Sequence, residues 1–496
     1  MSETTDLPEG WAWTAFSEVA DHRLGKMLDK RKNTGTLRPY LRNVNVRWHG
    51  FDLDDVLEMR IEDYELDKYT VRKGDLVICE GGEPGRAAIW TRDEPFAYQK
   101  ALHRARPRGG IEAAYLLYML EDAAGSGRLA EHFTGSTINH LTGRELAKVR
   151  VPLAPLAEQR RIVDALEAYL ADLDAGVAAL KAARRDLDRY RRSVLQAAVT
   201  GALTADWRAR HPEAEDAASV LERILEERRA QWEADQLATY ETKGKTPPKT
   251  WRDRYKEPAA PEADGLPDLP PRWVWASFSA LFDHRLGKML DKRKNTGTLR
   301  PYLRNVNVRW HGFDLDDVLE MRIEDDELHK YTVRKGDLVI CEGGEPGRGA
   351  IWKKEEPFAY QKALHRARPY SDVDAEFVLL YLEYAASSER LRRHFTGSTI
   401  SHLTGRALAE VAIPLPSPDE QAAITEAVDE RLSVAEAIAA EIDCQLARAA
   451  RLRRALLQRA FAGRLVPQDP ADEPASVLLA RLGGEVVPEA ASGPEA

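Results

Sequence analysis

The chain contains a long internal repeat, in which the same letters return after 262 residues. The segment "DHRLGKMLDKRKNTGTLRPYLRNVNVRWHG" runs from Asp21 to Gly50 and again from Asp283 to Gly312. Residues 21–63 equal 283–325 throughout, and weaker agreement extends each copy to about 195 residues. Solenoids and propellers repeat about every 20–50 residues. We therefore expect two copies of one domain, each with its own core.

Each copy predicts two kinds of structure in succession. Its first part has short apolar runs between Gly, Pro and Asp, which are typical of strands in a mixed α/β domain. The stretches 156–203 and 418–465 then carry apolar residues at helical spacing, and about forty helical residues extend roughly 60 Å. Two interpretations remain open for these stretches. Each is a core helix of its own domain, or the two form a coiled-coil pair, which their length and charged outer faces favour.

Charged or proline-rich linkers separate these parts. We expect six segments: a first mixed domain (1–153), a first long helix (154–203), a connector with a charged helix and a Pro-rich link (204–268), a second mixed domain (269–415), a second long helix (416–465) and an acidic C-terminal tail (466–496). The letters "ASVL" of the connector (218–221) return at 475–478, and the composition of the acidic stretch after them predicts disorder.

The net charge of −9, taken alone, argues against nucleic-acid binding, but the charge is unevenly distributed. Between Asp21 and Gly50 there are eight Lys or Arg against two acids, and residues 99–108 add four cations and no acid. Amide and aromatic side chains interleave with the cations of the first run, and such residue types bond phosphates and base edges. A solvated basic surface is the competing interpretation. We favour contact with DNA, made twice.

Two polar loops of each copy are further candidates for contact with DNA. "CEGGEPGR" (79–86) predicts a tight turn that brings Arg86 close to a phosphate, and "HFTGSTI" (132–138) offers hydroxyls that bond a phosphate or cap a turn. The predicted DNA-binding residues of the first copy are Arg23, Lys26, Lys30, Arg31, Lys32, Arg38, Arg42, Asn43, Asn45, Arg47, Trp48, Arg86, Gln99, Lys100, His103, Ser136 and Thr137. Those of the second copy are Arg285, Lys288, Lys292, Arg293, Lys294, Arg300, Arg304, Asn305, Asn307, Arg309, Trp310, Arg348, Gln361, Lys362, His365, Ser398 and Thr399.

No motif indicates catalysis, a cofactor or a metal. "GKT" at 244–246 is not a nucleotide loop, because Thr239 stands where the motif needs glycine. The histidines lack metal-ligand spacing, and the three cysteines (Cys79, Cys341 and Cys444) lack the spacing of a zinc site or a disulfide framework. No apolar run reaches the roughly 18–20 residues of a membrane helix, and "MSETTDLPEGW" does not look like a signal peptide. We expect a cytoplasmic location.

An ordered series of motifs covers nearly the whole chain. In the first copy it consists of "LPEGWAW" (7–13), "GDLVICEGGEPGR" (74–86), "GSTINHL" (135–141) and "VPLAPLAEQRRIV" (151–163). In the second it includes "LPPRWVW" (269–275), "GSTISHL" (397–403) and "IPLPSPDEQAAI" (413–424). This series resembles the specificity subunit of Type I restriction–modification systems.

The resemblance implies an α+β fold with two target recognition domains, whose long helices form an antiparallel coiled coil. It also implies double-stranded DNA as ligand and no catalytic activity of the chain's own. The implied partners are two methyltransferase subunits, which bind S-adenosylmethionine, and in some complexes two restriction or translocase subunits. The recognition subunit of a Type II system with a fused methylase–nuclease partner remains an alternative, as does a stand-alone DNA-modifying enzyme.

Recognition domains in this family commonly differ, whereas the two copies here are almost identical. Near-identical domains on antiparallel helices predict one short word read twice in opposite directions, which is an interrupted palindrome. We expect half-site centres about one helical turn, near 10 base pairs, apart.

Overall fold

The computed structural model describes residues 7–29, 31, 33–135, 138–261, 265–291, 293, 295–388, 390–397 and 401–483. The chain divides into two compact units, of which the first contains 1–182 and 442–496 and the second contains 183–441. Each unit therefore combines one mixed domain with parts of both long helices.

The first mixed domain contains twelve strands within its described residues. They are β1 (Ala12–Ala15), β2 (Ala20–Leu24), β3 (Thr36–Leu41), β4 (Val46–Arg47), β5 (Gly50–Phe51), β6 (Leu57–Ile61), β7 (Thr70–Val71), β8 (Leu76–Cys79), β9 (Ala87–Ile89), β10 (Phe96–Tyr98), β11 (Leu102–Pro107) and β12 (Arg150–Leu153). One four-stranded sheet has the order β2-β11-β8-β9, and the other has the order β6-β3-β10-β7. The pair β1-β12 joins the start of the domain to its end.

Short helices cover these sheets: α1 (Phe16–Val19), α2 (Leu66–Tyr69), α3 (Ala113–Gly125) and α4 (Gly143–Lys148). The apolar face of α3 includes Tyr115, Leu116, Met119 and Leu120, all of them fully buried in the core. This spacing by one, three and four residues places the four side chains on one side of the helix.

The second mixed domain repeats this architecture. Its elements are β13 (Val274–Ser277), α8 (Phe278–Leu281), β14 (Phe282–Leu286), β15 (Thr298–Leu303), β16 (Val308–Arg309), β17 (Gly312–Phe313), β18 (Leu319–Ile323), β19 (Thr332–Val333), β20 (Leu338–Cys341), β21 (Gly349–Ile351), β22 (Phe358–Tyr360), β23 (Leu364–Pro369), α9 (Ala375–Ser387), α10 (Gly405–Glu410) and β24 (Ala412–Leu415). The strand register is kept, since Ala97 faces Tyr40 in one copy and Ala359 faces Tyr302 in the other.

Two helices of 44 residues follow the domains: α5 (Leu156–Val199) and α11 (Pro418–Phe461). Each helix ends just before a glycine with positive φ, +72° at Gly201 and +63° at Gly463. A Cβ at Gly463 would lie 2.1 Å from Pro8 Cγ, and one at Gly201 would lie 2.5 Å from Pro270 Cγ. Glycine is therefore required at both stops, by conformation and by close packing.

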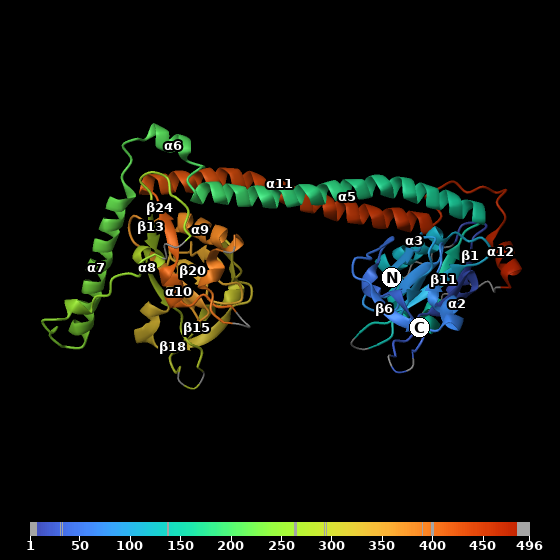
Figure 1. Cartoon of the computed structure of the whole chain (residues 1–496), viewed down its shortest axis with the longest axis horizontal. Coiled ribbons are helices and arrows are strands. Elements are labelled where there is room, and N and C mark those ends of the chain that lie inside the picture. The colour runs from blue at the N-terminus through green and yellow to red at the C-terminus, as the bar shows by residue number, and fades with distance from the viewer. Residues whose placement is uncertain are drawn as a thin grey trace, which may run out of the picture. The chain divides into compact units, whose positions relative to one another are not determined.

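The long helices pair with each other in opposite directions (Figure 1). In the first unit, Arg453 Nη1 of α11 lies 2.9 Å from Asp174 Oδ1 of α5. In the second unit, Arg191 Nη1 of α5 lies 3.0 Å from Glu436 Oε1 of α11. Partner numbers on α11 fall as those on α5 rise, which is the antiparallel arrangement. The coiled-coil interpretation is confirmed.

Each domain packs on the end of the helix that follows the other domain. The core of the first domain includes Leu457, Ala460 and Phe461 from α11. The core of the second domain includes Val194, Leu195, Ala198 and Val199 from α5. The beginning of each domain's own helix completes the same core, so both helices contribute to both units.

The connector supplies two more helices to the second unit, and the C-terminal segment supplies one to the first. The connector forms α6 (Ala205–Arg210) and α7 (Ala217–Thr242), and the C-terminal segment forms α12 (Ala475–Leu482). Ala217 N donates to Arg272 O at 3.0 Å and Ala475 N donates to Gly10 O at 2.8 Å, and these two carbonyls are equivalent in the repeat.

Residues 466–483 of the acidic C-terminal segment are described and contain α12. Leu478 and Leu479 of α12 are buried in the core of the first unit. The acidic composition concealed this short apolar face, whose stability comes from packing. Residues 484–496 lie outside the described residues.

Candidate nucleic-acid interface

The basic segment folds as a strand, a turn and a tight hairpin. Strand β3 leads into a 3₁₀ turn at Asn43–Asn45, and β4 and β5 then form the hairpin, with His49 at φ +63°. Asn45 holds the turn: its Oδ1 accepts from Arg42 N at 2.9 Å and its Nδ2 donates to Asp52 O at 3.0 Å. Asn45 is only 2% exposed. Together with its equivalent, Asn307, it has a structural role inside the domain.

Most arginines of the segment are paired with carboxylates that follow closely in sequence. The nitrogen–oxygen distances are 2.7 Å for Arg42–Asp55, 3.2 Å for Arg47–Asp52 and 3.3 Å for Arg38–Asp63. The second copy repeats the pairs as Arg304–Asp317, Arg309–Asp314 and Arg300–Asp325. The charge of these three arginines in each copy is therefore balanced by neighbouring carboxylates. Exposed ion pairs contribute about 0–1 kcal/mol, so a phosphate can compete for these guanidinium groups.

Lys26 is buried and not part of the surface. Its Nζ lies 2.8 Å from Glu62 Oε2 and also pairs with Glu65. Burial lowers the pKa of Lys26, but the hydrogen bonds to both glutamates outweigh it, and the pKa lies above its ordinary value. Lys288 makes the same pair of contacts in the second copy.

The glycine-rich turn packs against the basic segment, which brings two motifs together. Arg86 Nη2 donates to Asn43 O at 2.9 Å, and Arg86 Nη1 lies 2.6 Å from Glu83 Oε2. Gly82 has φ +80°, and a Cβ there would lie 2.8 Å from Asn43 Nδ2. The turn therefore needs glycine both for its conformation and for this close approach. Arg348 and Asn305 repeat the contact at 2.9 Å.

His103 lies inside the domain. It is 0% exposed, and its Nε2 lies 2.8 Å from Leu141 O. Burial lowers its pKa to about 4, so the ring is neutral and donates that hydrogen bond. His365 is equally buried, with its pKa also lowered to about 4. These two predicted DNA-binding residues therefore lie in the domain cores, because β11 and β23 are inner strands of their sheets.

The other predicted residues lie nearer the surface. Arg23, Arg31 and Lys100 are exposed, and within the described part of the chain no carboxylate pairs with them. The same holds for Arg285, Arg293 and Lys362. Gln99, Gln361, Trp48 and Trp310 are half-buried, and both tryptophans pack against the domain cores. The predicted residues outside the described ranges are Lys30, Lys32, Ser136, Thr137, Lys292, Lys294, Ser398 and Thr399.

A polar cluster that no sequence motif indicated ties the basic hairpin of the first domain to the helices. His49 Nε2 lies 2.6 Å from Glu121 Oε2, and Arg453 Nε lies 2.6 Å from Glu121 Oε1. Arg453 also reaches Asp174 on α5. Burial raises the pKa of Glu121, but hydrogen bonds from His49 and Arg453 outweigh it, and the pKa lies below its ordinary value. We call these four residues the first clamp.

The second clamp consists of His311, Glu383, Arg191 and Glu436. His311 Nε2 lies 2.7 Å from Glu383 Oε2, and Arg191 Nη2 lies 3.0 Å from Glu383 Oε1. Every member is offset by 262 residues from a member of the first clamp. The arginine, however, comes from the helix that follows the other domain. The repeated positions were visible in the sequence, but nothing in it indicated this exchange.

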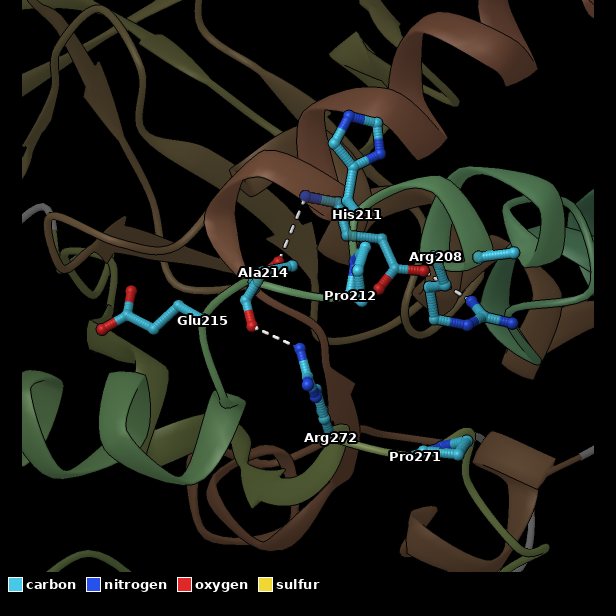
Figure 2. A pocket seen from close by; sticks show the side chains of 10 residues that line it. Arg208, His211, Pro212, Ala214, Glu215, Pro271 and Arg272 are labelled. Atoms are coloured by element: carbon cyan, nitrogen blue, oxygen red, sulfur yellow. Dashed lines mark hydrogen bonds and ion pairs between the residues drawn. The ribbon is translucent and has the colours of Figure 1, made fainter.

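A pocket of about 290 Å³ lies in the second unit, where the connector meets the start of α11 (Figure 2). Arg272 Nη1 donates to Ala214 O at 2.8 Å, and Arg208 pairs with Glu420. Trp273 Nε1 also donates to Glu420, at 2.9 Å. These polar groups already bond to one another, so we interpret the pocket as a structural joint.

No group of three or more His, Cys, Asp or Glu in the described residues is arranged to hold a metal ion. Within the same residues, no helix is both long and apolar enough to cross a membrane.

The model of the Type I restriction modification DNA specificity domain matches residues 8–180 and 293–443, well over half of the chain. The chain belongs to this family. The EcoKI specificity subunit of Escherichia coli K12 is 22% identical over 510 residues, covering 98% of this chain and 97% of the relative. The EcoBI specificity subunit of Escherichia coli is 25% identical over 435 residues, covering 86% and 82%.

The fold is shared with a solved structure from work on complex assembly and conformational transition of the type I R-M system. The TM-score is 0.63 at 18% identity, and the alignment covers 92% of this chain and 99% of that chain. The family match and these relatives support the Type I interpretation. None of them favours a Type II subunit or a stand-alone enzyme.

Proposed function

We propose that this Type I specificity subunit recognises an interrupted palindrome in double-stranded DNA. The observation that carries the proposal is that the repeated letters make repeated contacts. Arg42–Asp55 and Arg304–Asp317 are 2.7 and 2.8 Å long. Surfaces with the same side chains in the same positions read the same short word.

The orientation of the two words follows from the helices. An antiparallel pair of equivalent helices has an approximate two-fold axis, so we propose that the domains meet the duplex in opposite orientations. Half-site centres about one helical turn, near 10 base pairs, apart would let both domains approach the same side of the duplex.

The proposed interface consists of surface residues only. It keeps the exposed cations Arg23, Arg31 and Lys100, the turn residues Asn43 and Arg86, and their equivalents. It also keeps the paired arginines, which can exchange an exposed carboxylate for a phosphate. The residues excluded because they are buried are Lys26, Asn45, His103 and their equivalents.

We further propose that the chain is not catalytic and positions two methyltransferase subunits, which bind S-adenosylmethionine, with restriction or translocase subunits in a larger complex. Exposed apolar side chains on the long helices support a partner surface: Tyr169, Val434 and Leu452 are 58%, 59% and 50% exposed. Purified alone, the chain should incorporate no labelled methyl groups into DNA. Incorporation would contradict the non-catalytic proposal.

Methylome sequencing tests the palindrome directly. A host that expresses this chain with its methyltransferase should carry one methylated adenine in each half-site, placed symmetrically on the two strands. A methylated motif with two unrelated half-sites would overturn the proposal.

Single-copy variants provide a matched control. We expect Arg42, Arg47 and Lys100, changed together to alanine, to weaken DNA binding as much as the same changes at Arg304, Arg309 and Lys362. Each phosphate that is no longer neutralised should reduce the magnitude of the negative slope of log K against log salt by about 0.9. Unequal slopes for the two variants would mean that the copies bind DNA differently.

A further inference from the structure

We propose that the connector carries a second, sequence-independent DNA-binding surface, which grips the phosphate backbone beside only one of the two half-sites. This surface is formed by the second half of α7 and the segment that returns along it, residues 229–256, which we call the basic arm. The proposal rests on the proposed function, because it places the arm next to a domain that reads DNA.

The first half of α7 fastens the arm to the second domain. Arg223 Nε lies 2.6 Å from Asp372 Oδ2, and Arg228 Nε donates to Ser279 O at 3.1 Å. Val220 and Ile224 are buried in the core of that domain. The arm is therefore held by a packed helix at its base.

Aromatic packing makes the arm a defined structure. Trp232 stacks on Trp251 with ring centroids 5.9 Å apart, and it meets Tyr255 edge-on at 5.3 Å. Arg252 Nε lies 3.1 Å from Glu233 Oε2 and closes the same cluster. Beyond Arg228, the ion pairs and aromatic contacts that α7 makes within the described residues all lie inside the arm. These contacts hold the segment after α7 against the helix. The Pro-rich composition of that segment alone would not predict this packing.

The segment of the arm that returns along α7 is strongly basic. Residues 243–256 hold six Lys or Arg and one acid, Asp253, in a chain whose net charge is −9. Four lysines of this segment are exposed and have no carboxylate partner among the described residues. They are Lys243, Lys245, Lys249 and Lys256. The recognition surface differs in this respect, because there most arginines are already paired.

Unpaired, hydrated lysines on a rigid support suit a polyanion that needs no particular geometry, and the DNA backbone is such a ligand. The described residues of the first unit contain no matching arm. Its α12 occupies the place of α7 and ends at Leu482, and the sequence from Gly483 onward contains three Glu and no Lys or Arg. A symmetric target should therefore be covered asymmetrically.

The test uses the full chain with Lys243, Lys245 and Lys249 all changed to glutamate, bound to a duplex that carries the methylated motif in its centre. The slope of log K against log salt is negative, and we expect its magnitude to decrease by about 2–3. Each phosphate that the arm no longer neutralises accounts for about 0.9 of this decrease. Because the target is symmetric, the chain binds it in either orientation, and hydroxyl-radical footprinting should show partial wild-type protection that extends beyond both half-sites. The variant should lose this extension while both half-sites stay protected.

Three lysines of the second domain, each with an acidic or aromatic neighbour, serve as the control. Changing Lys335, Lys353 and Lys354 to glutamate alters the net charge equally and should leave the extension in place. A wild-type footprint that ends at the two half-sites, or an arm variant with unchanged slope and footprint, would overturn the proposal. Loss of methyltransferase binding with unchanged DNA protection would also overturn it and point to an acidic protein partner. If the wild type does not protect two half-sites, the proposed function fails instead.

Discussion

At the residue scale, the two buried histidines make the stability of each domain depend on pH. The pKa of His103 and of His365 is lowered by burial from 6.5 to about 4. Between these pH values the unfolded chain binds a proton on each histidine and the folded chain does not. Each neutral histidine therefore contributes to the free energy of unfolding. This contribution is complete above pH 6.5 and is lost as pH falls towards 4, and it amounts to at most about 3 kcal/mol for each histidine.

We expect the urea concentration at the midpoint of unfolding of the wild type to decrease as pH falls from 6.5 to 4. Changing both histidines to glutamine, which can still donate to the same carbonyls, should flatten the profile. The exposed His329 changed to glutamine serves as the control and should leave the profile as it is. An equally steep profile in the double variant would show that other groups carry the dependence.

At the element scale, the clamps fix each domain to the helix pair. Replacing Arg453 by alanine leaves the largely buried carboxylate of Glu121 without its arginine partner. Hydrogen bonds to charged groups contribute about 1.5–3 kcal/mol. We expect a coupling energy of that size between Arg453 and Glu121 in a double-mutant cycle, measured by denaturant unfolding.

Arg451 lies on the same helix, is exposed and is the matched control, with no coupling expected. Because the second clamp is equivalent, Arg191 and Glu383 should show a similar coupling energy. A coupling energy near zero in both clamps would mean that apolar packing alone holds the domains on the helices.

At the scale of the whole molecule, the exchanged helices predict how a half-chain associates. Residues 1–203 contain a complete set of clamp residues, but in the full chain Arg191 pairs with Glu383 and not with Glu121 of its own copy. We therefore expect this fragment to dimerise, with Arg191 of each copy reaching Glu121 of the other. Sedimentation of the fragment at micromolar concentration measures the association.

A longer fragment, residues 1–261, should dimerise more tightly, because it adds α7, whose Val220 and Ile224 complete the core of a domain. Arg191→Glu in either fragment should favour the monomer. A folded fragment that remains monomeric would contradict the exchange of helices.

Much of the architecture was determined by the sequence itself. An offset that preserves 21–63 as 283–325 requires two copies of one fold, since equal letters form equal local structure and equal cores. The long helices were also predictable, because helical spacing of apolar residues ends at Gly201 and Gly463, where only glycine suits the turn. The segregation of basic residues also indicated the exposed segment that forms β3 to β5.

The tertiary structure alone decided which of these parts lie together. An apolar helix face fits either domain equally well by its letters, and antiparallel pairing delivers the end of each helix to the other domain. Burial of His103 depends on the place of β11 between two strands, which a short apolar run does not reveal. The pairing of Arg42 with Asp55 and the folding of α12 also need contacts across space, since isolated short helices and single ion pairs are weak in water.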